Sequence, residues 1–354
     1  MNNRITLAHL TGFDELIDVR TPAEFALDHI PGAHNYPVLS DAERAEVGTV
    51  YVQESEFAGR KLGAAYIARN IASHLERHLA DRPRDWRPLV YCWRGGKRSG
   101  AMHHILRQVG WRAEKLEGGY KAWRQTVHAD MALLPGQFRY RVLCGLTGSG
   151  KSRVLEKLAA LGAQVLDLEA CARHRGSLLG SLPDTPQPGQ KMFEGVLWTA
   201  LQCFDPARPV YVEAESKRIG SLRVPPALIE AMWRPGQCIR LASPDSLRTE
   251  LLRQDYQHFL QQPQLLTARL DFLLELHGHQ QLEVWQRQIE QQQWDTFIAD
   301  LLHRHYDRSY NDSMRRHYAD FDTSPEVRLT GLDDASLTLA ARQILDLEVR
   351  SDMP

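Results

Sequence analysis

Residues 140–152 read YRVLCGLTGSGKS, and this stretch decides the fold of the second half of the chain. The apolar run from Tyr140 to Cys144 predicts a buried strand, and residues 153–161 predict an amphipathic helix. Between them, Gly145 to Ser152 match the pattern GxxxxGKS at every fixed position. A glycine-rich turn that joins a strand to a helix presents backbone amides to phosphate oxygens. The stretch therefore predicts a parallel α/β domain that carries a phosphate-binding loop.

The residues of this loop are expected to share the binding of a diphosphate or a longer polyphosphate. The glycines let the backbone fold around the phosphate oxygens, Lys151 neutralises the terminal phosphate, and Ser152 is a candidate ligand of Mg²⁺. The motif does not select which polyphosphate binds. The candidate diphosphate-binding residues are Gly145, Thr147, Gly148, Ser149, Gly150, Lys151 and Ser152.

Acidic and basic residues after neighbouring strands are candidate partners of this loop. Nucleotide-hydrolysing enzymes hold Mg²⁺ through an acidic residue at the end of an adjacent strand. Glu213 and Glu215 follow a predicted strand, and Asp167 is a weaker candidate; carboxylates that simply face solvent are an equal alternative. His174 and Arg175 lie beside a glycine and are candidate contacts to a diphosphate or an RNA backbone. Ordinary loop polarity explains these two residues nearly as well.

A second anion-binding loop is predicted in the first half of the chain, where residues 89–100 read LVYCWRGGKRSG. Cys92 ends a buried strand, and the glycine pair and helix that follow it would surround one anion with backbone amides and three cations. Such surroundings lower the pKa of a thiol and favour the nucleophilic thiolate. A buried structural cysteine is the alternative. The candidate anion-loop residues are Arg94, Gly95, Gly96, Lys97, Arg98 and Ser99.

Length and composition indicate a folded protein of two domains. The chain has 354 residues, of which 43% are hydrophobic and 25% charged, so neither disorder nor a collagen-like repeat is expected. The formal net charge of −1 argues against nonspecific binding of nucleic acid. Residues 81–125, however, contain 11 Lys/Arg against 4 Asp/Glu, a surplus of +7. An anionic partner would be attracted there, although a solvated basic face is the alternative.

The cysteines and the start of the chain indicate the compartment. The 5 cysteines are an odd number without CxxC spacing, so we expect neither a zinc cage nor a disulfide framework; a reducing compartment fits, and Cys144 is assigned to core packing. The start, MNNRITLAHLTGF, contains no apolar stretch long enough for a signal peptide, and no segment reaches the length of a membrane span. The protein is therefore expected to be cytoplasmic and is assumed to be a monomer.

The order of apolar runs predicts an α/β fold in both halves. A first domain is expected over residues 1–134 and a second over 135–354, in which residues 246–305 form a helical subdomain. A helix is also expected over residues 101–109. The predicted strands are residues 16–19, 89–91, 140–144, 164–168, 209–213 and 237–241.

The first domain resembles the rhodanese family. Residues 17–25, IDVRTPAEF, and 28–35, DHIPGAHN, are similar to its opening signature, and residues 116–123, LEGGYKAW, to its closing one. The resemblance implies that Cys92 carries a chalcogen as a persulfide or perselenide. It assigns Asp18, Arg20 and Glu24 to holding the fold together.

The whole chain resembles the tRNA 2-selenouridine synthase family over about residues 12–320. The resemblance rests on the cysteine loop, the phosphate loop and the stretches ERAEVGTVY (43–51), HRGS (174–177), QPGQKMFE (187–194) and EAESKRIG (213–220). Residues 306–310, YDRSY, depart from a Tyr-Asp-Pro-like pattern and put a local turn in doubt.

The resemblance implies replacement of sulfur by selenium at C2 of a tRNA wobble uridine. It also implies two co-substrates, geranyl diphosphate and selenophosphate, no tightly bound cofactor, and an enzyme that supplies selenophosphate as a partner. Lys151 and Ser152 would hold the diphosphate leaving group while sulfur is geranylated, and Cys92 would then deliver selenium. Trp93 is the first candidate for stacking on the displaced base.

Two other readings remain open from the sequence. The cysteine loop also fits the pattern Cys-x5-Arg-Ser through Cys92, Arg98 and Ser99, which predicts a cysteine-dependent phosphatase fused to a kinase-like nucleotide-binding domain. A non-catalytic adaptor with an inactive first domain is the second alternative. The three cations around Cys92 argue against the adaptor.

Overall fold

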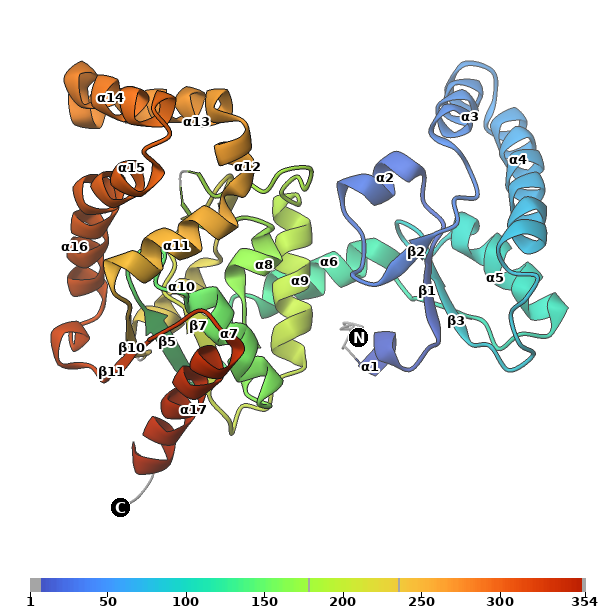
Figure 1. The fold of residues 1–354 in the computed structure, drawn as a ribbon. Helices are drawn as coiled ribbons and strands as arrows, with labels where there is room; N and C mark the ends of the chain where they lie inside the picture. The colour runs from blue at the N-terminus through green and yellow to red at the C-terminus, as the bar shows by residue number, and fades with distance from the viewer. Residues whose placement is uncertain (1–7, 178, 235, 352–354) are drawn as a thin grey trace. The chain divides into compact units, whose positions relative to one another are not determined.

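The first sheet consists of parallel strands in the order β2-β1-β3-β4 (Figure 1). In the computed structural model, which describes residues 8–177, 179–234 and 236–351, these strands carry apolar side chains that pack beneath helices. The predicted strands at 16–19 and 89–91 and the helix at 101–109 are confirmed. The strands are β1 (Glu15–Asp18), β2 (Ala33–Asn35), β3 (Pro88–Tyr91) and β4 (Glu114–Lys115). The helices that accompany them are α1 (Ala8–Thr11), α2 (Pro22–Leu27), α3 (Asp41–Gln53), α4 (Glu56–Arg77), α5 (Lys97–Val109) and α6 (Gly119–Asp130).

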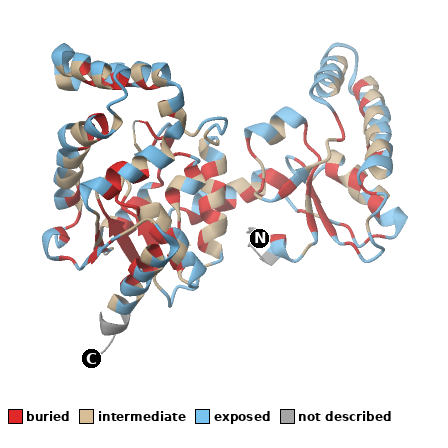
Figure 2. Ribbon diagram, in the orientation of Figure 1, coloured by how far each residue is buried: buried red, intermediate tan, exposed pale blue. Residues whose placement is uncertain are grey.

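A second parallel sheet, in the order β11-β10-β5-β7-β6, carries the phosphate loop on its central strand. The strands are β5 (Tyr140–Cys144), β6 (Gln164–Leu166), β7 (Val210–Glu213), β10 (Gln237–Ala242) and β11 (Glu326–Arg328), with a separate hairpin of β8 (Arg218–Ile219) and β9 (Leu222–Arg223). Helices α7 (Lys151–Ala160) and α17 (Asp334–Ser351) pack together, and their apolar side chains join those of the sheet in one core. Figure 2 shows the strands of this sheet as largely buried. The α/β class predicted for both halves is confirmed.

The helical subdomain predicted for residues 246–305 is also confirmed. Its core contains Phe259, Leu270 and Trp285. The chain continues as helix through residues 306–310, the stretch whose departure from a Tyr-Asp-Pro-like pattern had put a local turn in doubt. The remaining helices are η1 (Leu134–Gln137), α8 (Leu168–Ala172), α10 (Pro226–Trp233), α11 (Asp245–Asp255), α12 (Gln257–Gln261), α13 (Pro263–Leu270), η2 (Asp271–Leu273), α14 (Leu274–Glu290), α15 (Trp294–Leu301), η3 (Leu302–Asp307), α16 (Arg308–His317) and η4 (Phe321–Thr323).

The division of the chain differs from a single cut at residue 134. Residues up to Met131 form the first unit together with Gly189–Gln202, which contains α9 (Gln190–Gln202). This helix joins the first unit because it packs on α6: the Trp198 indole donates to Asp130 at 2.9 Å, and Arg124 pairs with Glu194. The second unit begins at Ala132. Within the described segments, no helix is both long and apolar enough to cross a membrane.

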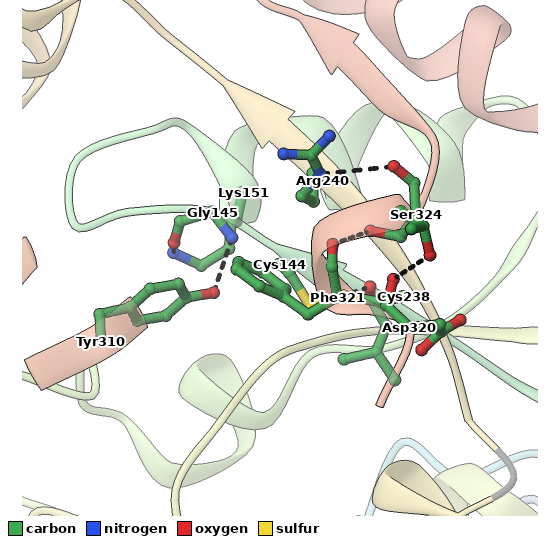
Figure 3. The surroundings of a disulfide bond; sticks show 11 residues. Cys144, Gly145, Lys151, Cys238, Arg240, Tyr310, Asp320, Phe321 and Ser324 are labelled. Atoms are coloured by element: carbon green, nitrogen blue, oxygen red, sulfur yellow. Dashed lines mark hydrogen bonds between the residues drawn. A yellow bond between two sulfur atoms is a disulfide. The ribbon is translucent and has the colours of Figure 1, made fainter. Parts of the chain in front are cut away.

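The expectation that all cysteines are reduced is wrong for one pair. Cys144 on β5 and Cys238 on β10 form a disulfide, with Cα atoms 6.2 Å apart (Figure 3). The two strands are hydrogen-bonded neighbours, and Cys238 lies opposite Val142. Both cysteines are buried, as expected for Cys144. Spacing along the chain could not reveal the pair, because 94 residues separate partners that only the sheet brings together.

We predict that denaturation with iodoacetamide in the absence of reductant labels three cysteines, Cys92, Cys171 and Cys203, and leaves the disulfide pair unlabelled. Replacing the pair with alanines should lower the free energy of unfolding by about 2–4 kcal/mol, because the cross-link restricts the unfolded chain. Peptide mass spectrometry and urea denaturation measure these two effects. Labelling of all five cysteines would contradict the cross-link, and Cys203→Ala serves as the control for loss of a thiol.

Candidate functional sites

The phosphate loop is held in its binding shape by contacts on both sides. The Gly145 amide donates to the Tyr310 hydroxyl at 2.7 Å, and the Lys151 ammonium donates to the Gly145 carbonyl at 2.7 Å (Figure 3). Gly150 has a φ of +89°, and a Cβ at this position would lie 2.8 Å from a methyl group of Leu329. Only glycine fits this close turn before α7. The loop thus joins the carboxyl end of β5 to the start of α7, and Thr147 to Ser152 line a pocket there.

A buried arginine supports the loop from beneath. Arg248 is 1% exposed, and its guanidinium donates to the Thr147 carbonyl at 3.0 Å. The same guanidinium pairs with Asp307 at 2.5 Å and with Asp245 at 3.0 Å. These carboxylates compensate a charge that would otherwise be costly to bury. Arg248, Tyr310 and Asp307 were not among the site residues predicted from the sequence, although two of them lie in the YDRSY stretch that departs from the family pattern.

Carboxyl groups gather beside Ser152. The Ser152 hydroxyl donates to Glu169 at 3.1 Å, and the Glu169 amide donates to the buried Glu213 at 2.9 Å. Glu215 lines the same pocket as Glu169, whereas Asp167 caps α8 by accepting from the Ala170 amide. Of the predicted acids, Glu215 therefore faces the site and Glu213 lies behind it. Glu169 is an additional site residue that the strand-end rule did not find, because it begins a helix.

Burial controls the protonation of these acids. It raises the pKa of Glu213 well above its usual range, and nearby Asp167 and Glu169 raise it further. Burial, with a contribution from Glu169, also raises the pKa of Glu215 to about 8, against the attraction of Lys151. Burial lowers the pKa of Lys151, although the carboxylates oppose this effect. Near neutral pH the cluster therefore holds protons that ordinary glutamates release.

The phosphate loop opens into a large pocket with an apolar side chamber. The pocket has a volume of about 680 Å³ and includes Lys151, Glu169 and Arg175 in its lining. Next to it lies a narrow apolar chamber of about 50 Å³. The residues that line both are Thr147, Ser177, Leu252, Tyr256 and Tyr306. The chamber is lined further by Leu179, Phe259, Leu260, Leu266, Phe297, Ile298, Leu301 and Leu302.

The predicted contacts His174 and Arg175 face different spaces. Arg175 lines the phosphate-loop pocket, donates to the Asp255 carbonyl and lies over the Tyr256 ring at 5.1 Å. His174 is 7% exposed and lines a neighbouring groove instead. Two adjacent residues of one motif thus serve different surfaces of the second unit.

In the first unit, Cys92 lies at the base of the second predicted loop. Its side chain is 4% exposed, and its sulfur is 3.2 Å from the Ser99 hydroxyl. The carbonyl of Cys92 accepts from the Tyr120 amide at 2.9 Å, so the closing signature packs directly against the loop. Gly119 makes this approach possible: it has a φ of +58°, and a Cβ there would collide with the Cys92 carbonyl. Trp93, the candidate stacking residue, is 40% exposed and lies beside Tyr120.

Hydrogen bonds set the protonation of Cys92. Burial alone would raise the pKa of the thiol, but the Ser99 hydroxyl and the amides of Ser99, Arg94 and Gly96 outweigh it and lower the pKa. The three cations of this loop differ in their surroundings, whereas the sequence predicted that all three surround one anion. Arg98 binds Glu24 through contacts of 2.6 and 3.3 Å, whereas Arg94 and Lys97 are exposed. Glu24 therefore positions an arginine of the loop, a role beyond holding the fold together.

Comparisons with known proteins find a family match in each half of the chain. Residues 138–270 match the family described as tRNA 2-selenouridine synthase AAA domain, and residues 5–126 match the Rhodanese-like domain. A tRNA 2-selenouridine synthase of Nitrosomonas europaea is 36% identical over 245 residues, covering 68% of this chain and 63% of that protein. The same-named protein of Hydrogenovibrio crunogenus is 33% identical over 252 residues, covering 68% and 67%. The chain belongs to the tRNA 2-selenouridine synthase family.

Another family member, from Nitrosomonas eutropha, is 36% identical over 256 residues, which cover 70% of this chain and 64% of that protein. The matched part of the chain therefore spans slightly less than two thirds of the two Nitrosomonas synthases.

The site of this synthase-family member fits Mg²⁺ only as the partner of a bound diphosphate. Among the residues described here, no three His, Cys, Asp or Glu side chains are placed to hold a metal ion by themselves. Ser152 and Glu169 supply two oxygen ligands at one point of the loop. Mg²⁺ commonly uses one or two protein oxygens and completes its shell with phosphate oxygens and water. These two residues would hold the ion, which would neutralise charge on the diphosphate.

We predict that Ser99→Ala raises the pKa of Cys92, because the thiolate loses a hydrogen bond that favours its charged form. The rate of iodoacetamide modification of the Cys92 peptide, followed against pH by mass spectrometry, should shift its midpoint upward. Ser40→Ala removes the cap of α3 and should leave the midpoint unchanged. An unchanged profile in Ser99→Ala would show that the hydroxyl does not stabilise the thiolate.

We further predict that Glu215 makes the protein less stable as pH rises. Between its ordinary pKa of 4.5 and about 8, the unfolded chain releases a proton that the folded chain retains, so the free energy of unfolding falls. Relative to Glu215→Gln, the wild type should therefore lose stability between pH 5 and pH 8 in urea denaturation. Glu156→Gln, an exposed substitution on α7, is the matched control. A constant difference between wild type and Glu215→Gln would contradict a raised pKa.

Proposed function

We propose that this protein replaces the sulfur of a tRNA wobble 2-thiouridine with selenium, by S-geranylation followed by selenium transfer. The observation that carries the proposal is a phosphate loop whose pocket continues into an apolar chamber. A nucleotide presents a polar ribose and base next to its phosphates, whereas geranyl diphosphate presents a hydrocarbon. The diphosphate would bind along Gly145–Ser152, with Lys151 at its terminal phosphate. The chamber would widen as its leucine side chains move around the prenyl chain.

Geranylation prepares the thiocarbonyl for substitution. The sulfur forms a bond to the allylic carbon while the carbon–oxygen bond to diphosphate breaks, and the base loses its N3 proton. Lys151 and the loop amides stabilise the departing diphosphate. The alkylated sulfur then makes C2 electrophilic and can leave as geranylthiol. Glu215, with its raised pKa, lies in the pocket where a proton must be accepted or returned.

Cys92 would carry the selenium as a perselenide. Selenophosphate provides selenium as selenide and releases phosphate, so formation of the S–Se bond requires a two-electron oxidant such as a small disulfide. The perselenide attacks C2 and geranylthiol leaves. A thiol then cleaves the S–Se bond, which returns two electrons and leaves selenium on C2. Arg94 and Lys97, exposed at the loop, would bind the selenophosphate oxygens.

The position of Arg98 supports a selenium carrier over a phosphatase. In the Cys-x5-Arg reading, this guanidinium would bind the phosphate held by the cysteine. Here both of its terminal nitrogens contact Glu24, and Arg44 approaches the same carboxylate at 3.7 Å. A phosphate ester would compete with this carboxylate for the arginine.

The test incubates the full chain with 2-thiouridine tRNA, geranyl diphosphate, selenophosphate and a thiol–disulfide buffer, followed by nucleoside mass spectrometry. Wild type should form 2-selenouridine, and omission of selenophosphate should leave S-geranyl-2-thiouridine. Lys151→Ala should lower both products at least tenfold, whereas Cys92→Ser should accumulate the geranylated nucleoside alone. Cys203→Ser, at an exposed free cysteine, is the control. Absence of both products from wild type, or wild-type selenation by Cys92→Ser, would reject the proposal.

A further inference from the structure

A basic groove beside the phosphate-loop pocket is not used by the chemistry proposed above. It has a volume of about 520 Å³, and the arginines in its lining are Arg173, Arg218 and Arg269. They come from the end of α8, from β8 and from α13, and all three are exposed. No acidic side chain of the described chain lines this groove, and the salt bridges found in the described residues involve none of the three. Their charges are therefore available to an anion.

A buried histidine forms part of the wall of the groove. His174 lines the groove, is 7% exposed, and its Nδ1 atom has no hydrogen-bond partner. Its ring is tightly enclosed, because Cβ atoms added to Gly180 and Gly220 would lie 3.0 and 2.9 Å from ring carbons. Unpaired polar atoms are rare in protein interiors, since an unmade hydrogen bond costs free energy. Because the Nδ1 atom is itself buried, the ring forms part of the groove wall, and the exposed arginines are the groups that can contact an anion.

The groove is preformed by one glutamine. The Gln187 side-chain amide donates to the carbonyls of Ala172 and Ile219 at 3.2 and 3.0 Å. Its oxygen accepts from the backbone amide of Ser221 at 2.8 Å and from the hydroxyl of the same residue at 3.1 Å. The glutamine thereby joins two loops that carry arginines of the groove. A site whose shape exists before binding loses less conformational entropy when the ligand arrives.

The groove and the neighbouring pocket differ in the charged residues that line them. The lining of the phosphate-loop pocket combines three acidic residues, Glu169, Glu215 and Asp255, with five Lys and Arg residues, whereas the only described Asp, Glu, Lys or Arg residues that line the groove are its three arginines. The two spaces meet at Gly176, Ser177 and Arg218, which line both. An RNA strand whose displaced base enters the pocket must pass its own backbone along a neighbouring surface. The groove is the adjoining surface that attracts phosphate.

We propose that the groove of Arg173, His174, Arg218 and Arg269 binds a phosphodiester of the substrate RNA next to the nucleotide that is modified. The inference rests on the proposed function and extends it to the surface that holds the RNA. The groove contacts phosphate and not base edges, so it positions the strand without reading its sequence. Its contribution is therefore the same for a modified and an unmodified anticodon loop.

The experiment measures fluorescence anisotropy of a fluorescein-labelled anticodon stem-loop RNA with the full chain over a series of NaCl concentrations. Arg173→Ala, Arg218→Ala and Arg269→Ala should each weaken binding by about threefold to tenfold and reduce the log–log salt slope by about 1. His174→Leu should weaken binding by about threefold. The factor should be equal for stem-loops with uridine and with 2-thiouridine. Arg342→Ala, an exposed arginine on α17 outside the groove, should bind as wild type does.

Circular dichroism and thermal unfolding establish that each variant is folded. If wild type binds the stem-loop and the arginine variants bind it equally well, the groove assignment is overturned while the proposed function stands. If the variants keep RNA affinity but lose thermal stabilisation by inorganic phosphate, the groove is a free-anion site and the RNA assignment is overturned. If wild type binds no stem-loop RNA at all, the proposed function fails together with the inference.

Discussion

Backbone amides at the start of a helix require acceptors, and this constraint underlies both candidate sites. In each unit a parallel strand ends, the chain makes a glycine turn, and a helix begins: β3 leads through Cys92 to α5, and β5 leads through Gly145 to α7. The amides of such a turn point toward one place and favour an anion there. In the first unit these amides lower the pKa of the Cys92 thiol, and in the second they would hold a phosphate of the proposed diphosphate. Under the proposed function, the same local architecture would supply a nucleophile in one unit and a leaving-group site in the other.

Ion pairs that are buried or partly buried hold each loop in shape. Arg248 holds the Thr147 carbonyl and is compensated by Asp307 and Asp245, while Glu24 holds Arg98 beside the cysteine loop. A buried ion pair stabilises a fold only weakly, but removal of one partner leaves an uncompensated charge. These pairs therefore specify one loop conformation more than they add stability. Burial also raises the pKa of Glu213 and of Glu215, which favours neutral acids close to Lys151.

The second unit brings three surfaces together around residues 173–177. Arg175 faces the phosphate-loop pocket, Ser177 lines both this pocket and the apolar chamber, and His174 faces the basic groove. A prenyl chain needs apolar surroundings, whereas a diphosphate and an RNA backbone need cationic ones. Their junction at one loop would place the allylic carbon next to the base that receives it. In the proposed function, the cysteine loop would serve a separate step, for which an ionised chalcogen carrier is required.

The sequence by itself determined the two loops, because their residues are contiguous and strand–turn–helix geometry is local. It likewise predicted the main strands, the helical region and the roles of Lys151, Ser152 and Cys92 as candidates. Only the tertiary structure decided which distant side chains complete these sites. Tyr310 accepts a hydrogen bond from Gly145, which lies 165 residues away in the sequence. Arg98 pairs with Glu24 across 74 residues, and Cys144 forms a disulfide with Cys238 across 94 residues. Helix α9 joins the first unit for the same reason. Packing and the pairing of charges determine these partners. Both depend on proximity in three dimensions and therefore leave no spacing pattern in the sequence.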